Sequence, residues 1–446
     1  MKRAIIISML CLIFGTQSHA QWTMPTEIEE VKAPFEMPQF KRPTFPNRTM
    51  SITKCGARQG KMATTAIQKC IDRVAKRGGG TVVVPKGKWL SGRIELKSNV
   101  CLHLESGAEL LFSGEIADYL PVVETRYEGV DVLSLGAMIY ANHAKNIAIT
   151  GNGKLIGPER DCQLMQHAMG GVSEDLQKMS LQQRVFDGTG GGEVCLPMFF
   201  SPIYCEDVFV EGVTFERSVF WNIVPVYCNR TVIRGVTVSS AGQSRTDGID
   251  IDSSTNSLIE YTTLTCGDDC FTLKSGRGMD GIKKNRPTEN VVIRNCRASG
   301  GVGAITVGSE TAAMVRNVYA CDCEMGKTMF GIYLKTRRPR GGGGENLWFE
   351  RISFNTPSSV AFNFDMLGSA KHVGNSASRF PAPQITELTP HFRNVVFRDI
   401  SVGDDCKQLI RAMGLPEAPI ENVTFENIKS RCQAISMQDV GTVIFK

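Results

Sequence analysis

The chain has 446 residues, of which 42% are hydrophobic and 21% are charged, so it is long enough to bury a large core. Its 44 glycines and the shortage of long helical patterns favour a fold of strands and turns. The formal net charge of +5 is too small to indicate nucleic acid as a partner, but it is compatible with an anionic polysaccharide.

Residues 1–20 are predicted to be a signal peptide. Lys2 and Arg3 precede an apolar run at residues 4–14, and small side chains lead up to a cleavage site after Ala20. Because the apolar run is too short to cross a bilayer, we expect no membrane anchor from it. The segment therefore predicts a secreted or periplasmic protein.

Cysteines are frequent in the chain. Removal of the signal peptide would leave 14 of the 15. An even number in an exported protein permits disulfides, and the sequence leaves their pairing open. Cys228, Cys266, Cys296 and Cys321 are interpreted instead as small apolar side chains stacked inside the fold. No cysteine or histidine spacing indicates a metal site.

Residues 21–49 are predicted to form an extended lead-in. The segment contains five prolines and has no apolar periodicity, so we expect it to lie along the surface or to be disordered. Regular structure is expected from residue 50 onward, and residues 50–446 are interpreted as one domain.

Residues 64–77 are predicted to be a single amphipathic helix. Apolar side chains share one face, Thr64 or Thr65 could serve as the N-cap, and Gly78 follows the last turn. Short strands separated by glycine, proline and asparagine turns follow. A lone helix ahead of many strands is suited to capping the open end of a solenoid.

A short pattern then recurs along the chain: a turn Asn or Asp followed by alternating apolar residues. It starts at Asn146, Asp207, Asn229, Asn256, Asn290, Asn317, Asn346, Asn394 and Asn422. From Asp207 to Asn346 the starts lie 22 to 34 residues apart, a spacing typical of solenoid repeats. A sandwich of hairpins would instead show tight two-residue turns. We therefore predict an all-β fold, a single-stranded parallel β-helix whose surplus residues form loops.

Residues 161–195 depart from the repeat. A helix is predicted at residues 173–186, and three glycines at residues 190–192 end it. A long insertion between coils is a common place for the wall of a binding cleft, but a plain surface loop remains the alternative. The glycines at residues 341–344 are interpreted as a mobile turn, because no phosphate-binding lysine motif follows them.

Three carboxylates are expected to meet. Asp268 and Asp269 follow Asp247 by 21 and 22 residues, which is about one turn of the predicted coil. Stacked coils would place these side chains above one another at the strand spacing of about 4.8 Å. Like charges so close raise at least one pKa, as a general acid beside a general base requires.

Other acidic positions are given structural interpretations. The string Gly-Asp-Asp-Cys recurs at residues 403–406, where no carboxylate stands one coil earlier. Asp next to Gly is also ordinary turn chemistry, so Asp247 is what distinguishes the first copy. Asp250 and Asp252 alternate with two isoleucines, so we expect them to point outward with turn or surface roles.

These motifs resemble those of glycoside hydrolase family 28, the polygalacturonases and their relatives, which are right-handed parallel β-helices that cleave pectin with inversion. The similarity runs from about residue 50 to the C-terminus and includes residues 51–57, 78–85, 147–153, 225–228 and 345–346. The resemblance implies that residues 50–446 form a catalytic domain that acts on acidic plant cell-wall polysaccharide or its oligosaccharides. It implies no metal and no organic cofactor.

Roles for individual residues follow from the same resemblance. Asp268 would be the general acid, Asp247 and Asp269 would activate the water, and Lys335 would bind a substrate carboxylate. One physical rule conflicts with this scheme. Inverting carboxylates usually stand about 6.5–9.5 Å apart to admit the water, whereas stacked coils predict shorter distances.

The chain departs from the family at four positions. Arg245 replaces an Asn, Val302 replaces the His of Gly-His-Gly, Tyr333 replaces the first Arg of Arg-Ile-Lys, and Val224 replaces a further His. Because all three acids are kept, we interpret the changes as altered substrate recognition. Val302 makes the wall apolar, Tyr333 offers a stacking face, and Arg245 could bind a carboxylate.

Several alternatives stay open. The arginines at 337, 338 and 340 could contact substrate or form a solvated loop. The runner-up function is cleavage of a rhamnogalacturonan or of a galacturonic acid side chain. A non-catalytic pectin-binding relative and a polysaccharide lyase are further possibilities, and the sequence leaves endo or exo action and the oligomeric state open.

Overall fold

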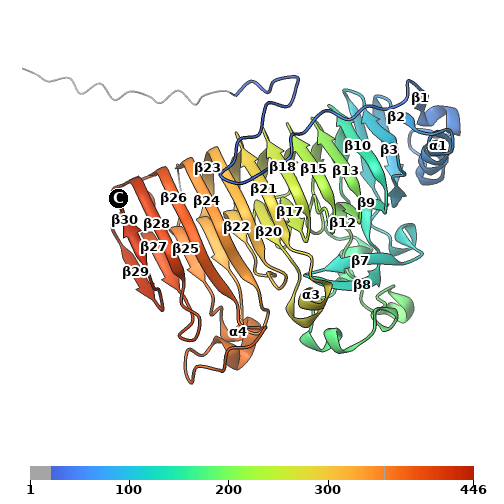
Figure 1. Ribbon diagram of the computed structural model, residues 1–446. Coiled ribbons are helices and arrows are strands. Elements are labelled where there is room, and N and C mark those ends of the chain that lie inside the picture. The colour runs from blue at the N-terminus through green and yellow to red at the C-terminus, as the bar shows by residue number, and fades with distance from the viewer. Residues whose placement is uncertain (1–21, 356) are drawn as a thin grey trace, which may run out of the picture.

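The chain winds into a parallel β-helix (Figure 1). The computed structural model describes residues 22–355 and 357–446, so the predicted signal peptide lies outside the described residues. Apart from one antiparallel hairpin, the paired strands are parallel and in register with those of the neighbouring coils. The predicted fold class is therefore confirmed.

Each coil contributes strands to three rows. The first row contains β1 (Thr49–Ser51), β2 (Gly80–Val84), β5 (Val100–Leu104), β10 (Lys145–Gly151), β13 (Glu206–Glu211), β15 (Asn229–Arg234), β18 (Thr255–Glu260), β21 (Thr288–Arg294) and β30 (Val443–Phe445). The second contains β3 (Gly87–Ser91), β6 (Ala108–Phe112), β11 (Lys154–Ile156), β14 (Thr214–Glu216), β16 (Thr237–Ser239) and β19 (Thr263–Thr265).

The third row is called the site face below. It contains β4 (Ile94–Glu95), β9 (Ala137–Asn142), β12 (Met198–Ile203), β17 (Ile249–Asp252), β20 (Phe271–Lys274), β25 (Val360–Asp365), β27 (Gln408–Met413) and β29 (Ile435–Gln438). Long strands run from one row into the next, namely β22 (Arg297–Val307), β23 (Val315–Lys335), β24 (Gly343–Phe354), β26 (His391–Val402) and β28 (Glu421–Ser430). One cluster of buried apolar side chains fills the helix from Ile52 to Phe425.

The recurring asparagines mark one corner of every coil. At each predicted start except Asn229, the residue has a φ angle between 53° and 59°, a left-handed conformation that Asn and Asp tolerate better than most residues. Their side chains also form a ladder. Asn317 donates to Asn290 at 3.1 Å, Asn290 donates to Asn256 at 3.2 Å, and the ladder continues to Asn422. The repeat seen in the sequence is therefore the turn chemistry of the corner.

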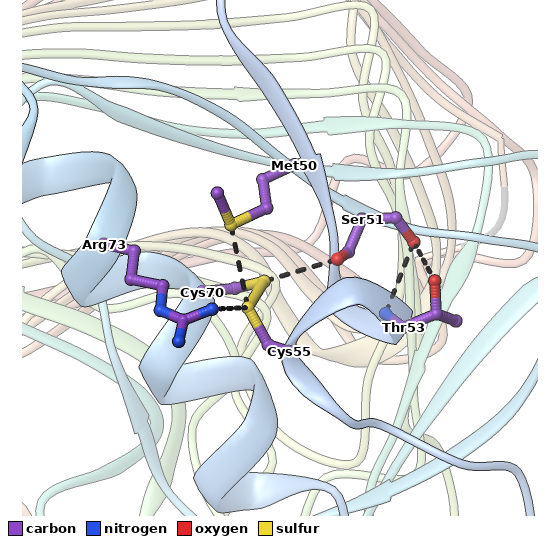
Figure 2. The surroundings of a disulfide bond; sticks show 6 residues. All are labelled: Met50, Ser51, Thr53, Cys55, Cys70 and Arg73. Carbon is purple, nitrogen blue, oxygen red and sulfur yellow. Dashed lines mark hydrogen bonds between the residues drawn. A yellow bond between two sulfur atoms is a disulfide. The ribbon is translucent and has the colours of Figure 1, made fainter.

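The predicted capping helix is present as α1 (Thr64–Lys76). Its apolar face, including Ile67 and Cys70, is buried against the first coil. The predicted threonine N-cap is wrong, because the N-cap is Ala63 and the Thr64 hydroxyl accepts a hydrogen bond from the N–H of Gly92 at 2.7 Å. A disulfide from Cys55 to Cys70 ties the helix to the 3₁₀ turn before it (Figure 2).

The four cysteines that the sequence predicts to be small apolar core residues are free thiols, and all four are buried. Cys228, Cys266 and Cys296 lie in the inner core, as the sequence predicts. Cys321 belongs instead to a smaller buried cluster on the outside of the first row, which also includes Val31, Met37 and Phe40 of the lead-in. It was therefore wrongly placed inside the coils.

Residues 22–48 contain no helix or strand and run along the outside of the first row (Figure 1). Arg234 donates to the carbonyl oxygens of Pro25 and Thr26, at 2.6 and 3.1 Å. Farther along, Arg294 donates to the carbonyls of Glu29 and Glu30. Of the two alternatives for the lead-in, a position along the surface is therefore the one observed.

The insertions gather beside the site face. The helix predicted at residues 173–186 is wrong, because two 3₁₀ turns, Glu174–Lys178 and Leu181–Gln183, are separated by an extended Met179. An antiparallel hairpin of β7 (Val123–Tyr127) and β8 (Val130–Ser134) precedes them. Figure 1 shows this hairpin, α3 (Gly278–Lys284) and α4 (Ala370–Val373) projecting on one side of the β-helix. Within the described residues, every helix is too short or too polar to cross a membrane.

Candidate active site

The structure brings the three predicted acids together at the start of two adjacent site-face strands. Asp247 comes two residues before β17, and Asp269 and Asp268 come two and three residues before β20. Ile249 pairs with Phe271, so the same register sets Asp247 beside Asp269. One oxygen of each of the three carboxylates lies within 4.8 Å of the others. The separations of 21 and 22 residues thus correspond to one coil.

The three acids line a cleft of about 390 Å³. Its lining combines acids, cations and aromatic rings: Glu128, Trp221, Arg245, Asp247, Asp268, Asp269, Lys274, Val302, Ser309, Glu310, Phe330, Tyr333, Lys335, Arg337 and Arg340. All seven site residues predicted from the sequence are among them. Such a cleft suits an acidic and partly apolar substrate.

Asp269 is held on both of its side-chain oxygens. Lys335 donates to one oxygen at 2.6 Å, and the N–H of Gly303 donates to the other at 2.8 Å. Burial opposes the charge on Lys335, but Asp269, Tyr333 and Asp268 together outweigh burial and raise the pKa of the lysine. A side chain at position 303 would place its Cβ 2.8 Å from Asp269 and 2.1 Å from Thr306, so this approach requires glycine.

Asp247 and Asp268 both favour their protonated forms more than a free carboxyl does. Burial raises the pKa of Asp247 well above its usual range, and repulsion from Asp250 and Asp268 adds to it. Burial and then Asp269 raise the pKa of Asp268. Asp268 is the more exposed of the two and accepts main-chain N–H groups of Arg245 and Asp269, at 3.3 and 3.1 Å. The group is therefore able to keep a proton within reach of the cleft.

Lys274 and Glu310 were missed in the sequence. The ammonium of Lys274 lies 3.6 Å from Asp247, 3.3 Å from Glu310 and 4.5 Å from the centre of the Trp221 ring. Strand alternation could have indicated Lys274, because Phe271 and Leu273 point inward and position 274 therefore points outward. No sequence pattern pairs it with Glu310, which is 36 residues away.

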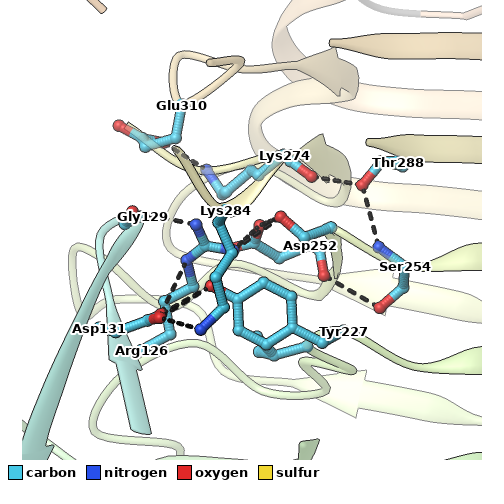
Figure 3. A network of polar contacts seen from close by, with 12 residues as sticks. Arg126, Gly129, Asp131, Tyr227, Asp252, Ser254, Lys274, Lys284, Thr288 and Glu310 are labelled. Carbon is cyan, nitrogen blue, oxygen red and sulfur yellow. Dashed lines mark hydrogen bonds and ion pairs between the residues drawn. The ribbon is translucent and has the colours of Figure 1, made fainter. Parts of the chain in front are cut away.

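Asp250 and Asp252 point out of the coil as predicted, but their predicted surface role is wrong. Both are fully buried, because the hairpin and neighbouring side chains cover this part of the sheet. Asp252 accepts a hydrogen bond from Arg126 of the hairpin at 3.0 Å, in the network of Figure 3. Burial raises the pKa of Asp250 to about 8, against the opposing charge of Lys274.

Arg245 reaches the cleft but is already engaged. Its guanidinium donates to the Tyr127 hydroxyl at 2.7 Å, to Glu128 at 2.8 Å and to the Met169 carbonyl at 2.9 Å. It also lies 5.0 Å from the centre of the Phe220 ring. Arg245 therefore holds the hairpin and the 161–195 insertion against the coil that carries Asp247.

Val302 and Tyr333, two of the departures from the family pattern, line the cleft together with Phe330. These three side chains are called the apolar strip below. Val302 donates its main-chain N–H to the Asp268 carbonyl at 2.9 Å and leaves its side chain beside the acids. The Tyr333 ring lies 4.5 Å from that of Phe330 and 4.7 Å from the Lys335 ammonium. Val224 does not share this lining, because it is fully buried beneath the surface.

The solvated-loop interpretation of the three arginines is wrong, since each is at most 9% exposed. Arg338 forms two bonds with Glu417, at 2.6 and 2.7 Å. Arg340 lines the cleft and donates to Glu310 at 2.6 Å, and Arg337 lines it beside Asp365. The second Gly-Asp-Asp-Cys string lies outside the cleft, where Asp404 is exposed and pairs with Arg431 at 2.9 Å.

Among the described residues, the three catalytic candidates also form the one set of acids close enough to converge on a metal ion. Two ammonium groups, of Lys335 and Lys274, already lie 2.6 and 3.6 Å from two of these acids. A divalent cation would have to share that space with both charges. The residues present are better suited to moving protons than to holding a metal.

Comparison with known proteins agrees with this geometry. The pattern described as "Glycosyl hydrolases family 28" matches residues 183–429, more than half of the chain, and this stretch includes all three acids. The chain belongs to glycosyl hydrolase family 28. It is therefore a glycoside hydrolase, as the resemblance in its motifs implies.

Individual relatives are similar along most of the chain. A Vitis vinifera protein named "Probable polygalacturonase" is 29% identical over 376 residues, covering 82% of this chain and 70% of the relative. An exo-poly-alpha-D-galacturonosidase of Dickeya chrysanthemi is 25% identical, and this chain spans 56% of its length. The structure of an exopolygalacturonase from Thermotoga maritima matches with a TM-score of 0.79 and 27% identity, over 91% of this family 28 chain and 93% of the other.

Proposed function

We propose that this family 28 hydrolase cleaves the glycosidic bonds of pectic galacturonan and removes galacturonic acid from a chain end, with inversion. The observation that carries the proposal is the meeting of three carboxylates with several cations in one open cleft. Polygalacturonases among its relatives support galacturonan as the substrate. Residues 50–446 would form the catalytic domain.

In this scheme Asp268 is the general acid. It protonates the glycosidic oxygen while the bond from that oxygen to the anomeric carbon breaks. A water on the opposite face gives a proton to Asp247 or Asp269 and forms the new bond to the anomeric carbon. The proton then returns to Asp268 through solvent, so no covalent intermediate or cofactor is needed. Asp269 suits the base role because Lys335 and the N–H of Gly303 hold its two oxygens in place.

Action at a chain end is supported by the hairpin. Glu128, at its turn, lines the cleft and is bonded to Arg245, so a substrate chain that extended past Arg245 would meet this wall. Several relatives are named exo-acting enzymes. The buried ion pair of Arg126 with Asp252 fixes the hairpin to the site face (Figure 3).

The apolar strip favours a second candidate, cleavage of rhamnogalacturonan. Val302 and Phe330 lie beside the acids in the cleft and could pack against the methyl group of a deoxy sugar. Galacturonan remains the first candidate, because Lys335, Arg337 and Arg340 line the same cleft and carry charges that complement uronic acids.

A substrate panel tests the proposal. The protein is purified from the exported fraction, where we expect its N-terminus at Gln21 after removal of the signal peptide. It is then incubated with polygalacturonate and with rhamnogalacturonans, and the products are identified by mass. We expect galacturonic acid monomer as the first product of polygalacturonate, with little early fall in viscosity.

Other outcomes of the panel would contradict the proposal in different ways. Cleavage of rhamnogalacturonan alone would select the second candidate. Mixed oligomers from polygalacturonate would show internal cleavage. An unsaturated product that absorbs in the ultraviolet would identify a lyase, and binding without any product would identify a pectin-binding protein.

A further inference from the structure

Lys274 is a buried cation beneath the acid group. Its side chain is 4% exposed, and three carboxylates surround the ammonium: Asp247 and Asp250 at 3.6 Å and Glu310 at 3.3 Å. Burial opposes its charge, but the carboxylates of Glu310, Asp250, Asp247 and Asp269 outweigh burial and raise its pKa well above the usual range. Lys274 is therefore a buried ammonium group that keeps its proton to higher pH than a free lysine does.

The position of this charge is fixed by its surroundings. The ammonium lies 4.5 Å from the centre of the Trp221 ring and donates to the Gly308 carbonyl at 3.3 Å. Glu310, its closest acid, is held on its other oxygen by Arg340 at 2.6 Å. A buried charge is screened by solvent much less than an exposed one, and its partners keep this one in place. Its electrostatic effect on the pKa of neighbouring acids is therefore strong.

The acids that Lys274 faces differ in their roles. Asp247 and Asp269 are the proposed bases, and Asp268 is the proposed acid. The charge of Lys274 lowers the pKa of Asp247 and of Asp268, against the burial that raises both. Asp250 and Asp252 feel the same charge from the neighbouring strand, and Lys335 faces the group from β23. A single residue thus biases both the acid and the base.

We propose that Lys274 is a positioning residue that sets the pH range in which the three acids catalyse hydrolysis. This inference rests on the proposed function of the cleft. It adds that the pH dependence of the reaction is set by Lys274, a residue outside the group of three acids. Without the cation, each acid would keep its proton to a higher pH. The base would then lose its proton and become active only at a higher pH. The acid would also lose its proton at a higher pH.

The test is the pH profile of kcat for polygalacturonate in the variant Lys274→Met. Both limbs of the profile are expected to move to higher pH by about one to two units, because an opposite charge at this distance lowers a carboxyl pKa by about 1–3 units. KM at the optimum is expected to change by less than about threefold. A second variant, Lys274→Arg, keeps the charge, so its profile should stay near that of the wild type even if kcat falls.

Lys284→Met is the matched control. Lys284 is also a lysine beside aromatic rings, 4.7 Å from the centre of Tyr227, and pairs with Asp131 at 2.9 Å in the same network (Figure 3). It does not line the cleft, so its pH profile should not shift.

The results would separate this inference from the function on which it rests. An inactive wild-type protein would refute the proposed function. An active wild type whose Lys274→Met variant loses kcat equally at every pH would refute the positioning role and leave a structural one. An equal shift in Lys284→Met, or a Lys274→Arg profile displaced as far as that of Lys274→Met, would also overturn the inference.

Discussion

Replacement of Asp268 by Asn is expected to lower kcat for polygalacturonate by about 10²- to 10⁴-fold, the usual contribution of a general acid. The amide has nearly the same shape but has no acidic proton to give to the leaving oxygen. The amide oxygen can still accept one of the two main-chain N–H groups that bond to Asp268, and Lys335, Arg337 and Arg340 remain in the cleft, so substrate should still bind. The measurement pairs initial rates with the affinity for a galacturonate oligomer.

The chain supplies a control for this variant in its second Gly-Asp-Asp-Cys string. Asp404→Asn makes the same change in the same local sequence, at an exposed position outside the cleft, and should leave kcat and affinity unchanged. A loss of less than tenfold in Asp268→Asn would refute its role as the acid. A loss of affinity as large as the loss of rate would assign Asp268 to binding instead.

Replacement of Lys335 by Met is expected to lower kcat/KM by about 10²-fold or more. The change removes the 2.6 Å partner of Asp269, a carboxylate that is 1% exposed, and leaves a buried charge without its main compensation. It also removes a cation from the cleft that the family resemblance assigns to a substrate carboxylate. Both effects act together, so kcat and KM should each worsen.

Lys327→Met is the control for this second variant. Lys327 lies on the same strand, β23, but is exposed and does not line the cleft. Rates and KM should match those of the wild type, with unchanged thermal unfolding. If Lys335→Met kept its kcat/KM within threefold of the wild type, Lys335 would have no part in catalysis or substrate binding.

Stacking of the acids could be predicted because the coil between Asp247 and Asp269 carries no long loop. Its 22 residues make one turn, so Ile249 pairs with Phe271 and the acids before them lie side by side. The asparagine repeat was informative for a similar reason, since each corner needs the same left-handed residue. The fold and the acid group could be predicted because the coil length and the corner residue repeat along the axis of the β-helix.

Features that depend on long-range contacts were not predicted. Arg338 meets Glu417 across 79 residues, and Arg245 meets Glu128 across 117, so nothing local distinguishes these arginines from solvated ones. Asp250 and Asp252 point outward as their alternation requires, but the hairpin that buries them lies more than 100 residues earlier. Alternation reports the side of a strand on which a residue lies, but not what covers that side.

The anomeric form of the first product tests the central claim most directly. The nearest oxygens of the three acids lie within 4.8 Å of one another, closer than the 6.5–9.5 Å usual for inverting pairs. The distance between the acids therefore does not by itself predict the anomeric configuration of the product. Proton NMR during the first minutes of hydrolysis of an α-linked galacturonide should show β-galacturonic acid forming ahead of mutarotation. Initial release of the α-anomer would mean that one of the carboxylates attacks the sugar, and it would contradict an acid that works with two bases through water.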